Sequence, residues 1–418
     1  MTNARPIYLD NHATTRVDPQ VVAAMLPYLA DDSGNAGSRT HDYGRRAAEA
    51  VARAREAVAD LLGAGPEDVT FTSGATESNN LAIKGICNAD VAPGHVVTSQ
   101  TEHHAVLDVC RELERRGWEV SYLPARADGR VSAGDVAAAV RANTRLVSIM
   151  WANNETGVIN DIDGIGAVCR DRGIFFHTDG AQAVGRVPVD MQRSPFDLLS
   201  VSGHKIYGPK GVGALVTTRA ARRALRPLQQ GGGQERGMRP GTLPVHQLVG
   251  LGEAARLAAQ DLDPSEVARV AGIRDRFLAL LRAALPVEVN GSVEHRLPGN
   301  LNIWFKGCDT EALAMRCREV AFSTGSACTS ESLESSYVIT ALTGDEQRAA
   351  ESARFGFGRF TTDECAQRAA AAITRSVLEL RALSPRARSE RAAPNPSALC
   401  DDSIVREPKF WTTTDESR

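Results

Sequence analysis

The amino-acid sequence predicts an α/β protein with a mainly parallel sheet covered by helices on both faces, followed by a smaller α+β unit. Two observations support this prediction. From about residue 44 to 260, short apolar segments alternate with segments of helical period and length, which is the pattern of a parallel sheet with crossover helices. Beyond about residue 260, long helical stretches and a few strand-like segments replace this alternation.

The first predicted elements are a helix, a strand and a second helix. Residues 44–63 have the helical period and end at Gly63, where a left-handed glycine would close the helix. Residues 69–74 form a short predicted strand, and a helix over 75–87 opens directly after it. Further strands are expected at 95–99, 119–123, 145–153, 174–179, 198–204 and 213–218, and further helices at 104–116, 132–142 and 161–172.

The remaining chain is predicted to form a second unit, onto which the first few residues pack. Its expected elements are helix 264–285, strand 299–305, helix 309–319, a loop with Cys328, strand 352–360 and a last helix to about 383. We therefore expect a large domain at 16–260 and a small domain formed by 1–15 with 261–383. Residues 384–418 contain four prolines and no sustained period, which predicts an extended or disordered tail.

Composition and charge argue against several classes of protein. The 418 residues are 43% hydrophobic and 24% charged, with a net charge of -3, which gives no electrostatic argument for binding nucleic acid or an anionic membrane. No apolar run approaches the roughly 18–20 residues that span a bilayer. The opening "MTNARPIYLD" is too short and polar for a signal peptide. We expect a cytoplasmic protein with no direct contact to membrane or nucleic acid.

Cysteine spacing supports no metal site, because none of the eight cysteines forms a CxxC pair. In a reducing compartment, most of them should pack as buried free thiols. Cys328 differs, since it lies in "STGSACTSESLESSY" (323–337) among residues that favour loops. It is either a small residue in a Ser-rich turn or a reactive, accessible thiol.

The strongest local signal is "SVSGHKIYGPKGVG" (200–213), which places Lys205 at the end of an apolar strand. Asp179 ends another strand, "IFFHTD", and ligands of open α/β sheets bind at such carboxyl ends. A lysine amine and a carboxylate in one crevice fit pyridoxal phosphate, because the lysine can form a Schiff base and the carboxylate can keep the pyridine nitrogen protonated. The plainer interpretations are a surface lysine and an N-cap aspartate.

Three other segments supply candidate cofactor contacts after successive strands. "TSGATESNN" (72–80) runs from a glycine turn into a helix, so the N–H groups of Ala75 and Thr76 can receive a phosphate; an ordinary capping sequence fits the same residues. His103 in "TEHHAVLD" suits ring stacking or proton transfer. Asn154 in "WANNETG" can contact the ring hydroxyl.

These motifs together resemble the IscS/NifS-like cysteine desulfurases of the class V aminotransferase superfamily. The resemblance covers about residues 5–385 and implies a PLP-dependent transferase of fold type I, with a seven-stranded large-domain sheet. It is carried, in order, by "IYLDNHATTRVDP", "FTSGATESNNLAIKG", "TEHHAVLD", "ANNETGVI", "HTDGAQAVG", "SGHKIYGPKGVGAL", "GGGQERGMRPGTLPVHQ", "GSACTSESLESSYV" and "RFGFGRFT".

The resemblance implies a role for each matching residue. Lys205 would attach the cofactor, Asp179 would hold the pyridinium, His103 would stack on the ring and move protons, and Gln182 would contact the phenolate oxygen. Thr76, Ser202 and His204 would hold the phosphate, with Thr242 contributed across a homodimer interface. Asn154 and Arg354 would bind the substrate carboxylate, a task that suits guanidinium.

The implied reaction converts L-cysteine to L-alanine and leaves a persulfide on Cys328 for acceptors such as an iron–sulfur scaffold. No resident metal is implied, although Cys328 could transiently contact a cluster on a scaffold. Other possibilities remain open: a selenocysteine lyase or β-lyase, a desulfurase serving tRNA thiolation or DNA sulfur modification, and a non-catalytic sulfur carrier or scaffold. The intact Lys205, Asp179, His103 and Arg354 argue against the last.

Overall fold

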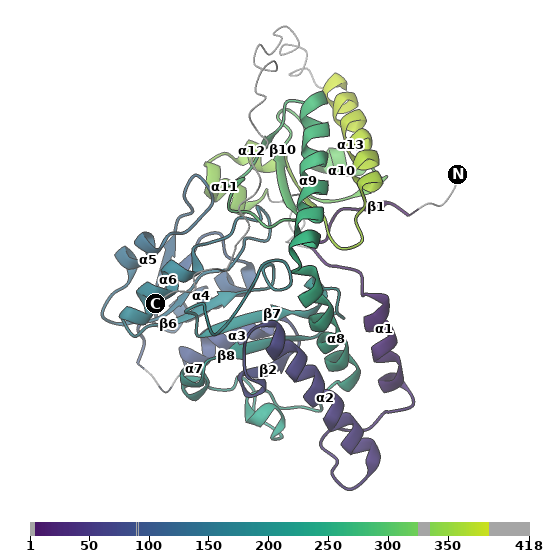
Figure 1. Ribbon diagram of the computed structural model, residues 1–418. Coiled ribbons are helices and arrows are strands. Elements are labelled where there is room, and N and C mark those ends of the chain that lie inside the picture. The colour runs from purple at the N-terminus through teal and green to yellow at the C-terminus, as the bar shows by residue number, and fades with distance from the viewer. Residues whose placement is uncertain (1–4, 89, 91, 325–334, 384–418) are drawn as a thin grey trace, which may run out of the picture.

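Two sheets, of seven and four strands, organise the molecule in the computed structural model, and a third has only two strands (Figure 1). The structure describes residues 5–88, 90, 92–324 and 335–383, so Cys328 and the predicted tail lie outside the described residues. The larger sheet forms the centre of the molecule. The smaller sheet lies above it in Figure 1, with the first strand of the chain beside it.

The larger sheet has seven strands and is mainly parallel, as predicted. Strand β8 departs from this pattern, because it pairs antiparallel with both of its neighbours, β2 and β7. The other pairs are parallel. In spatial order the strands are β2 (Val69–Thr72), β8 (Gly213–Thr217), β7 (Leu198–Ser202), β6 (Phe175–Asp179), β5 (Thr144–Ser148), β3 (His95–Ser99) and β4 (Glu119–Leu123).

Helices cover both faces of this sheet, so its central strands are apolar on both sides. Successive side chains of a strand point to opposite faces, and Leu198 and Leu199 accordingly belong to two different cores. One face packs against α1 (Pro19–Met25), α2 (Asp42–Leu61), α5 (Ala133–Ala139), α6 (Ile162–Asp171) and α8 (Val245–Asp261). The other packs against α3 (Ala75–Ile86), α4 (His104–Arg115) and α7 (Arg219–Ala224).

The smaller sheet is antiparallel and has its own core. Its order is β12 (Ser323–Thr324), β13 (Ser352–Gly356), β10 (Asn300–Trp304) and β9 (Glu288–Val289). The helices of this part are α9 (Pro264–Ala284), α10 (Thr310–Arg316), α11 (Tyr337–Thr343), α12 (Glu346–Ala350) and α13 (Asp363–Leu383). Strand β1 (Ile7–Tyr8) pairs in parallel with β11 (Val320–Ala321), which joins the start of the chain to this unit.

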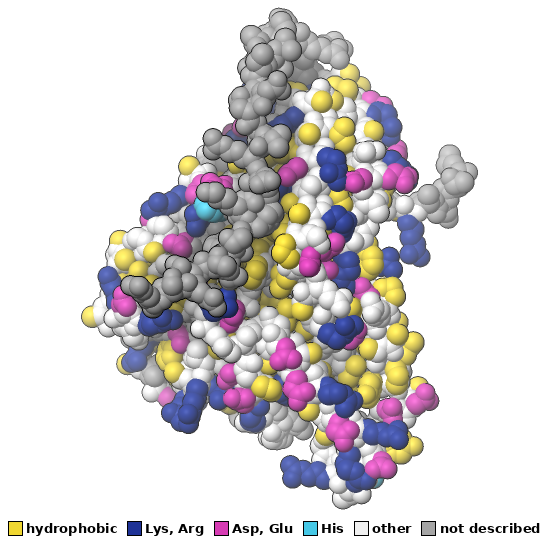
Figure 2. Space-filling model, viewed as in Figure 1, with side chains coloured by type: hydrophobic (Ala, Val, Ile, Leu, Met, Phe, Trp, Pro, Cys, Tyr) yellow, Lys and Arg dark blue, Asp and Glu magenta, His cyan; other side chains and the backbone are white. Residues whose placement is uncertain are grey.

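All seven strands predicted for the large sheet are present, and α2 ends as predicted, with Gly63 at a φ of 60°. The division of the chain at residues 15 and 260 stays a prediction. Of the helices in the described ranges, none has the length and apolar character needed to cross a membrane. Figure 2 shows basic and acidic side chains interspersed over the visible face.

The core of the small unit depends on Phe277 of α9, whose ring is fully buried 5.0 Å from the ring of Phe355 and 5.3 Å from that of Phe357. Phe277→Ala would leave a cavity there, and we expect it to lower the free energy of unfolding by about 3–5 kcal/mol. Urea titration of the full chain measures this change. Leu280→Ala, on the same helix but 42% exposed, is the control and should cost about 0.5 kcal/mol. Equal effects in both variants would contradict the assigned packing.

Candidate active site

A cleft of about 460 Å³ opens where the carboxyl ends of the large-sheet strands meet the small unit. This is the place where open α/β sheets bind ligands. Ten of the predicted site residues line it: Ala75, Thr76, His103, Asn154, Asp179, Gln182, Ser202, His204, Lys205 and Arg354. Thr242 is exposed and does not line the cleft of its own chain. Cys328 lies outside the described residues.

Asp179 is the last residue of β6 and is only 7% exposed. Its Oδ2 accepts a hydrogen bond of 2.7 Å from the Asn79 side chain, and its Oδ1 accepts one of 2.9 Å from the Ala181 N–H. The plainer interpretation, an N-cap aspartate, was wrong in its helix, because residues 181–186 form a turn; the second bond holds the start of that turn. The two donors also fix the carboxylate at the base of the cleft.

Lys205 follows β7 through the short 3₁₀ helix Gly203–Lys205, which turns the chain sharply at the edge of the sheet. Its Nζ donates to the carbonyl oxygen of Ala13 at 2.8 Å and to that of His12. Both acceptors are neutral backbone groups, and they hold the amine on the floor of the cleft.

His103 is the N-cap of α4, and its Nδ1 accepts from the Ala105 N–H at 3.1 Å. Burial lowers the pKa of His103, while Asp179 opposes this shift and Lys205 adds to it. Because Nδ1 is used as an acceptor, the neutral ring carries its proton on Nε2. His103 can therefore offer a neutral aromatic face and one transferable proton.

The N-terminus of α3 forms one end of the cleft and has no side-chain cap. Gly74, its N-cap residue, has a φ of 149°, and a Cβ added there would meet nothing within 4 Å. Glu77 reaches back to the Ser73 N–H at 2.7 Å, as in a capping sequence. The first N–H groups of the helix nevertheless remain directed at open space, which suits an anion.

His204 also lines the cleft and follows the strand-terminal Ser202 in the 3₁₀ helix Gly203–Lys205. Its Nδ1 is 3.1 Å from the hydroxyl of Thr14. Burial, together with the positive charges of Lys205, Lys210 and Arg186, lowers the pKa of His204 to about 4. The ring is therefore neutral at physiological pH and acts through hydrogen bonding instead of charge.

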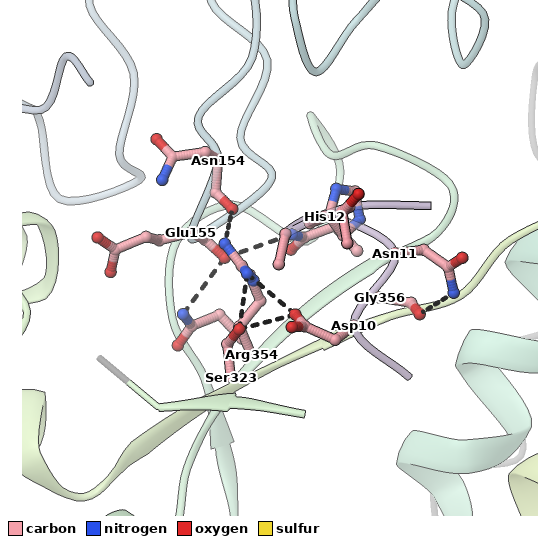
Figure 3. A network of polar contacts seen from close by, with 12 residues as sticks. Asp10, Asn11, His12, Asn154, Glu155, Ser323, Arg354 and Gly356 are labelled. Atoms are coloured by element: carbon pink, nitrogen blue, oxygen red, sulfur yellow. Dashed lines mark hydrogen bonds and ion pairs between the residues drawn. The ribbon is translucent and has the colours of Figure 1, made fainter. Parts of the chain in front are cut away.

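Arg354 of β13 is the contribution of the small sheet and is 4% exposed. Its Nη1 donates to the backbone oxygen of Asn154 at 2.8 Å, and its Nη2 donates to Asp10 at 3.0 Å and to the Ser323 hydroxyl at 2.8 Å (Figure 3). Its buried Nε–H has no partner among the described residues. That unused donor, on a guanidinium lining the cleft, suits a carboxylate ligand.

Gln182 has several partners within the protein. Its Oε1 is 2.8 Å from Nδ1 of His12 and accepts from Arg186 at 3.2 Å, while its Nε2 donates to the His12 carbonyl oxygen at 3.0 Å. His12 is fully buried, and its Nε2 lies 3.0 Å from the Gly299 carbonyl oxygen. Burial, reinforced by Arg186 and Arg354, holds the pKa of His12 well below its usual range.

The cleft residues fit pyridoxal phosphate. The open N-terminus of α3 suits the phosphate, Asp179 offers a fixed carboxylate for the ring nitrogen, and Lys205 brings its amine into the same cleft. Within the described ranges, no group of three or more His, Cys, Asp or Glu side chains could hold a metal ion. The six described cysteines are free, and all except Cys365 are buried.

Comparison with known proteins agrees with this geometry. The family model described as Aminotransferase class-V matches residues 7–368. Cysteine desulfurase IscS of Neisseria meningitidis (serogroup A / serotype 4A) is 50% identical over 386 residues, 92% of this chain and 95% of that relative. The chain belongs to the class-V aminotransferase family. Its cysteine desulfurases depend on pyridoxal phosphate, as does this enzyme.

Two solved structures extend the likeness to the fold of the family. One, titled "NIFS-LIKE PROTEIN", has a TM-score of 0.83 at 30% identity and covers 90% of this chain and 100% of its own. The other, titled "SspA in complex with cysteine", has a TM-score of 0.76 at 36% identity and covers 85% of this chain and 99% of its own.

Several residues that build this site were not predicted from the sequence. Asp10 and His12 lie in the quoted motif "IYLDNHATTRVDP", which was the available signal, but their contacts to Arg354 and Gln182 span 344 and 170 residues. Asn79 reads in sequence as an ordinary helix residue. Ser323 is the first residue of the segment 323–337 that contains Cys328, and nothing local indicates its bond to Arg354.

The ion pair between Asp10 and Arg354 should stabilise the site as well as shape it, because Arg354 is almost completely buried. Asp10→Ala would remove the carboxylate from this guanidinium, and we expect a loss of about 2–3 kcal/mol in the free energy of unfolding. Urea titration compares it with Asp31→Ala, which changes an exposed aspartate. If the two variants were equally stable, the pair would contribute nothing to the fold.

Proposed function

We propose that this chain is a cysteine desulfurase that converts L-cysteine to L-alanine, collects the sulfur on Cys328 and supplies it for iron–sulfur cluster assembly. The observation that carries the proposal is the meeting of Lys205, Asp179 and Arg354 in one cleft from three separate elements. A cofactor-linked amine, a carboxylate for the ring nitrogen and a guanidinium for a substrate carboxylate are what an α-amino acid reaction of this kind requires.

Substrate binding falls to Arg354 and Asn154. In the proposed complex, the partnerless Nε–H of Arg354 would donate to the substrate carboxylate, while its other nitrogens stay on Asp10, Ser323 and the Asn154 backbone. These fixed contacts keep the guanidinium from turning, so its free donor points one way. A preorganised donor binds at a smaller entropy cost than a mobile one.

The cofactor would be held by the phosphate seat at Ala75 and Thr76 with Ser202 and His204, and by Asp179 at the ring nitrogen. Gln182 would lie at the phenolate oxygen, with Asn154 nearby. When bound, pyridoxal phosphate supplies an electron sink for the carbanion formed at the substrate α-carbon. Lys205 takes up the α-proton at Nζ, and His103 stacks on the ring and exchanges protons through Nε2.

The sulfur step is a nucleophilic attack by the Cys328 thiolate on the substrate sulfur. The bond between the substrate β-carbon and its sulfur breaks and a sulfur–sulfur bond forms. The β-carbon receives the electron pair and then a proton, giving alanine and a Cys328 persulfide with no external oxidant. Ser323, which donates to Asp10 and accepts from Arg354, precedes Cys328 by five residues. Covalent geometry alone therefore limits the separation of their α-carbons to about 18 Å.

The assembly and partners of the enzyme form part of the proposal. A homodimer would bring Thr242, exposed on its own chain, to the phosphate of the partner's cleft. The persulfide would pass to an iron–sulfur scaffold protein and to other acceptors such as those of tRNA thiolation, in the cytoplasm. The relative from Neisseria meningitidis named cysteine desulfurase IscS supports this assignment.

The decisive test follows both products from L-cysteine in the presence of a reductant. The wild type should release alanine and sulfide in equal amounts, and Cys328→Ser should lose both. Lys205→Ala is the control for cofactor attachment, and it should lose turnover together with the absorbance of the lysine-linked cofactor. If Cys328→Ser kept producing alanine and sulfide at the wild-type rate, the enzyme would be a direct-elimination lyase instead.

Arg354 should affect substrate binding more than cofactor binding. Arg354→Lys keeps the charge but cannot reach Asn154, Asp10 and the substrate together, and we expect KM for L-cysteine to rise about tenfold or more. The absorbance of the bound cofactor should be retained. A steady-state titration with L-cysteine measures the change, and an unaltered KM would exclude the carboxylate role.

A further inference from the structure

Two buried side chains beside Asp179 have no part in the reaction described above. Asn79 of α3 and Glu102, which lies between β3 and α4, are both 0% exposed. Each also has one side-chain oxygen without a partner in the described chain, Oδ1 of Asn79 and Oε2 of Glu102. Buried polar atoms normally find partners, so these two atoms call for an explanation.

Asn79 holds Asp179 directly. Its Nδ2 donates to Oδ2 of Asp179 at 2.7 Å, and the only other donor to this carboxylate in the described chain is the Ala181 N–H. An amide can donate to a carboxylate without adding charge. Asn79 therefore fixes the direction in which the Asp179 carboxylate points.

Fewer hydrogen-bond donors surround the Glu102 carboxyl group than surround that of Asp179. A single donor, the Met150 N–H, reaches its Oε1 at 2.7 Å, and no Lys or Arg lies within ion-pair distance of Glu102 in the described chain. Burial, together with the negative charge of Asp179, raises the pKa of Glu102 well above its usual value, while the Met150 N–H opposes the shift. Glu102 therefore keeps its proton.

The groups around Glu102 do not compete for that proton. Asp179, at the end of β6, is close enough to repel a second negative charge on Glu102. Cys110 comes from α4, and burial raises the pKa of its thiol to about 12, so it is neutral. Tyr337 of α11 donates its hydroxyl to the Glu102 backbone oxygen at 2.5 Å. His103 follows in the chain, and burial lowers its pKa.

We propose that Asn79 and Glu102 are positioning residues for Asp179: Asn79 fixes the carboxylate, and Glu102, kept as a neutral acid, leaves Asp179 as the negative charge that meets the pyridine nitrogen. The inference deepens the proposed function and rests on its assignment of Asp179. The unused atoms support it, because Oε2 of a protonated Glu102 is a donor and Oδ1 of Asn79 is an acceptor. With a proton on Glu102, one of the two unpartnered oxygens becomes a donor, so this buried region no longer holds two unsatisfied acceptors.

Two neighbouring carboxyl groups separate into one acid and one base when their surroundings differ. Here Asp179 receives two hydrogen bonds and Glu102 receives one. If Glu102 lost its proton, a second negative charge would lie beside Asp179 without an added donor. The repulsion between the two charges would push the Asp179 carboxylate away from the position at which it meets the ring nitrogen.

The first experiment needs no turnover and compares the full-length wild type with Glu102→Gln in urea between pH 5 and 8. Unfolded Glu102 ionises near its ordinary value of 4.5, whereas the folded protein keeps the proton. As the pH rises, ionisation of residue 102 in the unfolded chain therefore lowers the free energy of unfolding of the wild type. Glu102→Gln has no carboxyl group at this position, so its stability does not change with pH for this reason. The ratio of their unfolding constants should grow about tenfold per pH unit. Glu155, also buried, titrates in both proteins and cancels.

A ratio that stays flat over this pH range would overturn the assignment of Glu102 as a neutral acid, whatever reaction the enzyme performs. Glutamine is the matched replacement for a carboxylic acid, since it has one acceptor and one donor group. Glu102→Leu is the unmatched control, because it leaves the Met150 N–H without an acceptor.

The second experiment measures cofactor affinity by absorbance after removal and titration of pyridoxal phosphate. Asn79→Leu removes the donor to Asp179 and should weaken binding about tenfold or more, and Glu102→Leu should also weaken it. Glu102→Gln should rescue most of the loss seen in Glu102→Leu. Wild-type affinity in Asn79→Leu, with Asp179→Asn weakened, would overturn the role of Asn79. Wild-type affinity in Asp179→Asn would instead count against the proposed function.

Discussion

Arg354 is a buried guanidinium between the two sheets, and the substrate side of the cleft depends on how it is paired. A buried charge is stable only with close partners. Its partners come from three places: Asp10 from the start of the chain, Ser323 from β12 and the Asn154 backbone from the segment that follows β5 of the large sheet. The arginine cannot be satisfied unless all three come together, so the folding of the small unit onto the large one also builds the substrate site (Figure 3).

The cleft has a net positive charge because of the side chains that line it. Lys205, Lys210 and Arg354 line it together with Asp179 and Glu77, and Glu77 is paired with Arg239. Burial lowers the pKa of each of the lining histidines described, His12, His103 and His204, so they add no charge at neutral pH. The remaining excess is positive, which suits a phosphate and an amino-acid carboxylate. The neutral rings supply shape and hydrogen bonds without strengthening the repulsion between cations.

Much of the large sheet could be predicted from sequence because each strand carries its own signal, a short apolar run followed by Gly or a polar residue. The antiparallel direction of β8 could not, since Gly213–Thr217 has the same composition as the parallel strands around it. The residues of the site could likewise be predicted only where a local sequence pattern marks them. Lys205 and Asp179 stand at strand ends and were predicted, whereas Asn79, Glu102 and Asp10 matter through contacts with residues distant in sequence, which no local pattern encodes.

The arrangement separates two requirements of the chemistry. The groups proposed to hold the cofactor, including Asp179 and Lys205, stand at the ends of strands packed on both faces, where the surrounding core resists displacement. Arg354, which is proposed to bind the substrate, belongs to the small sheet. A hydrogen bond to the Asn154 backbone, across the boundary between the small and the large unit, holds its guanidinium in the cleft. A change at that boundary would alter substrate binding before cofactor binding. Asp10 lies on this boundary. Loss of its carboxylate should therefore lower the affinity for substrate, while the cofactor-binding residues at α3 and β6 keep their positions.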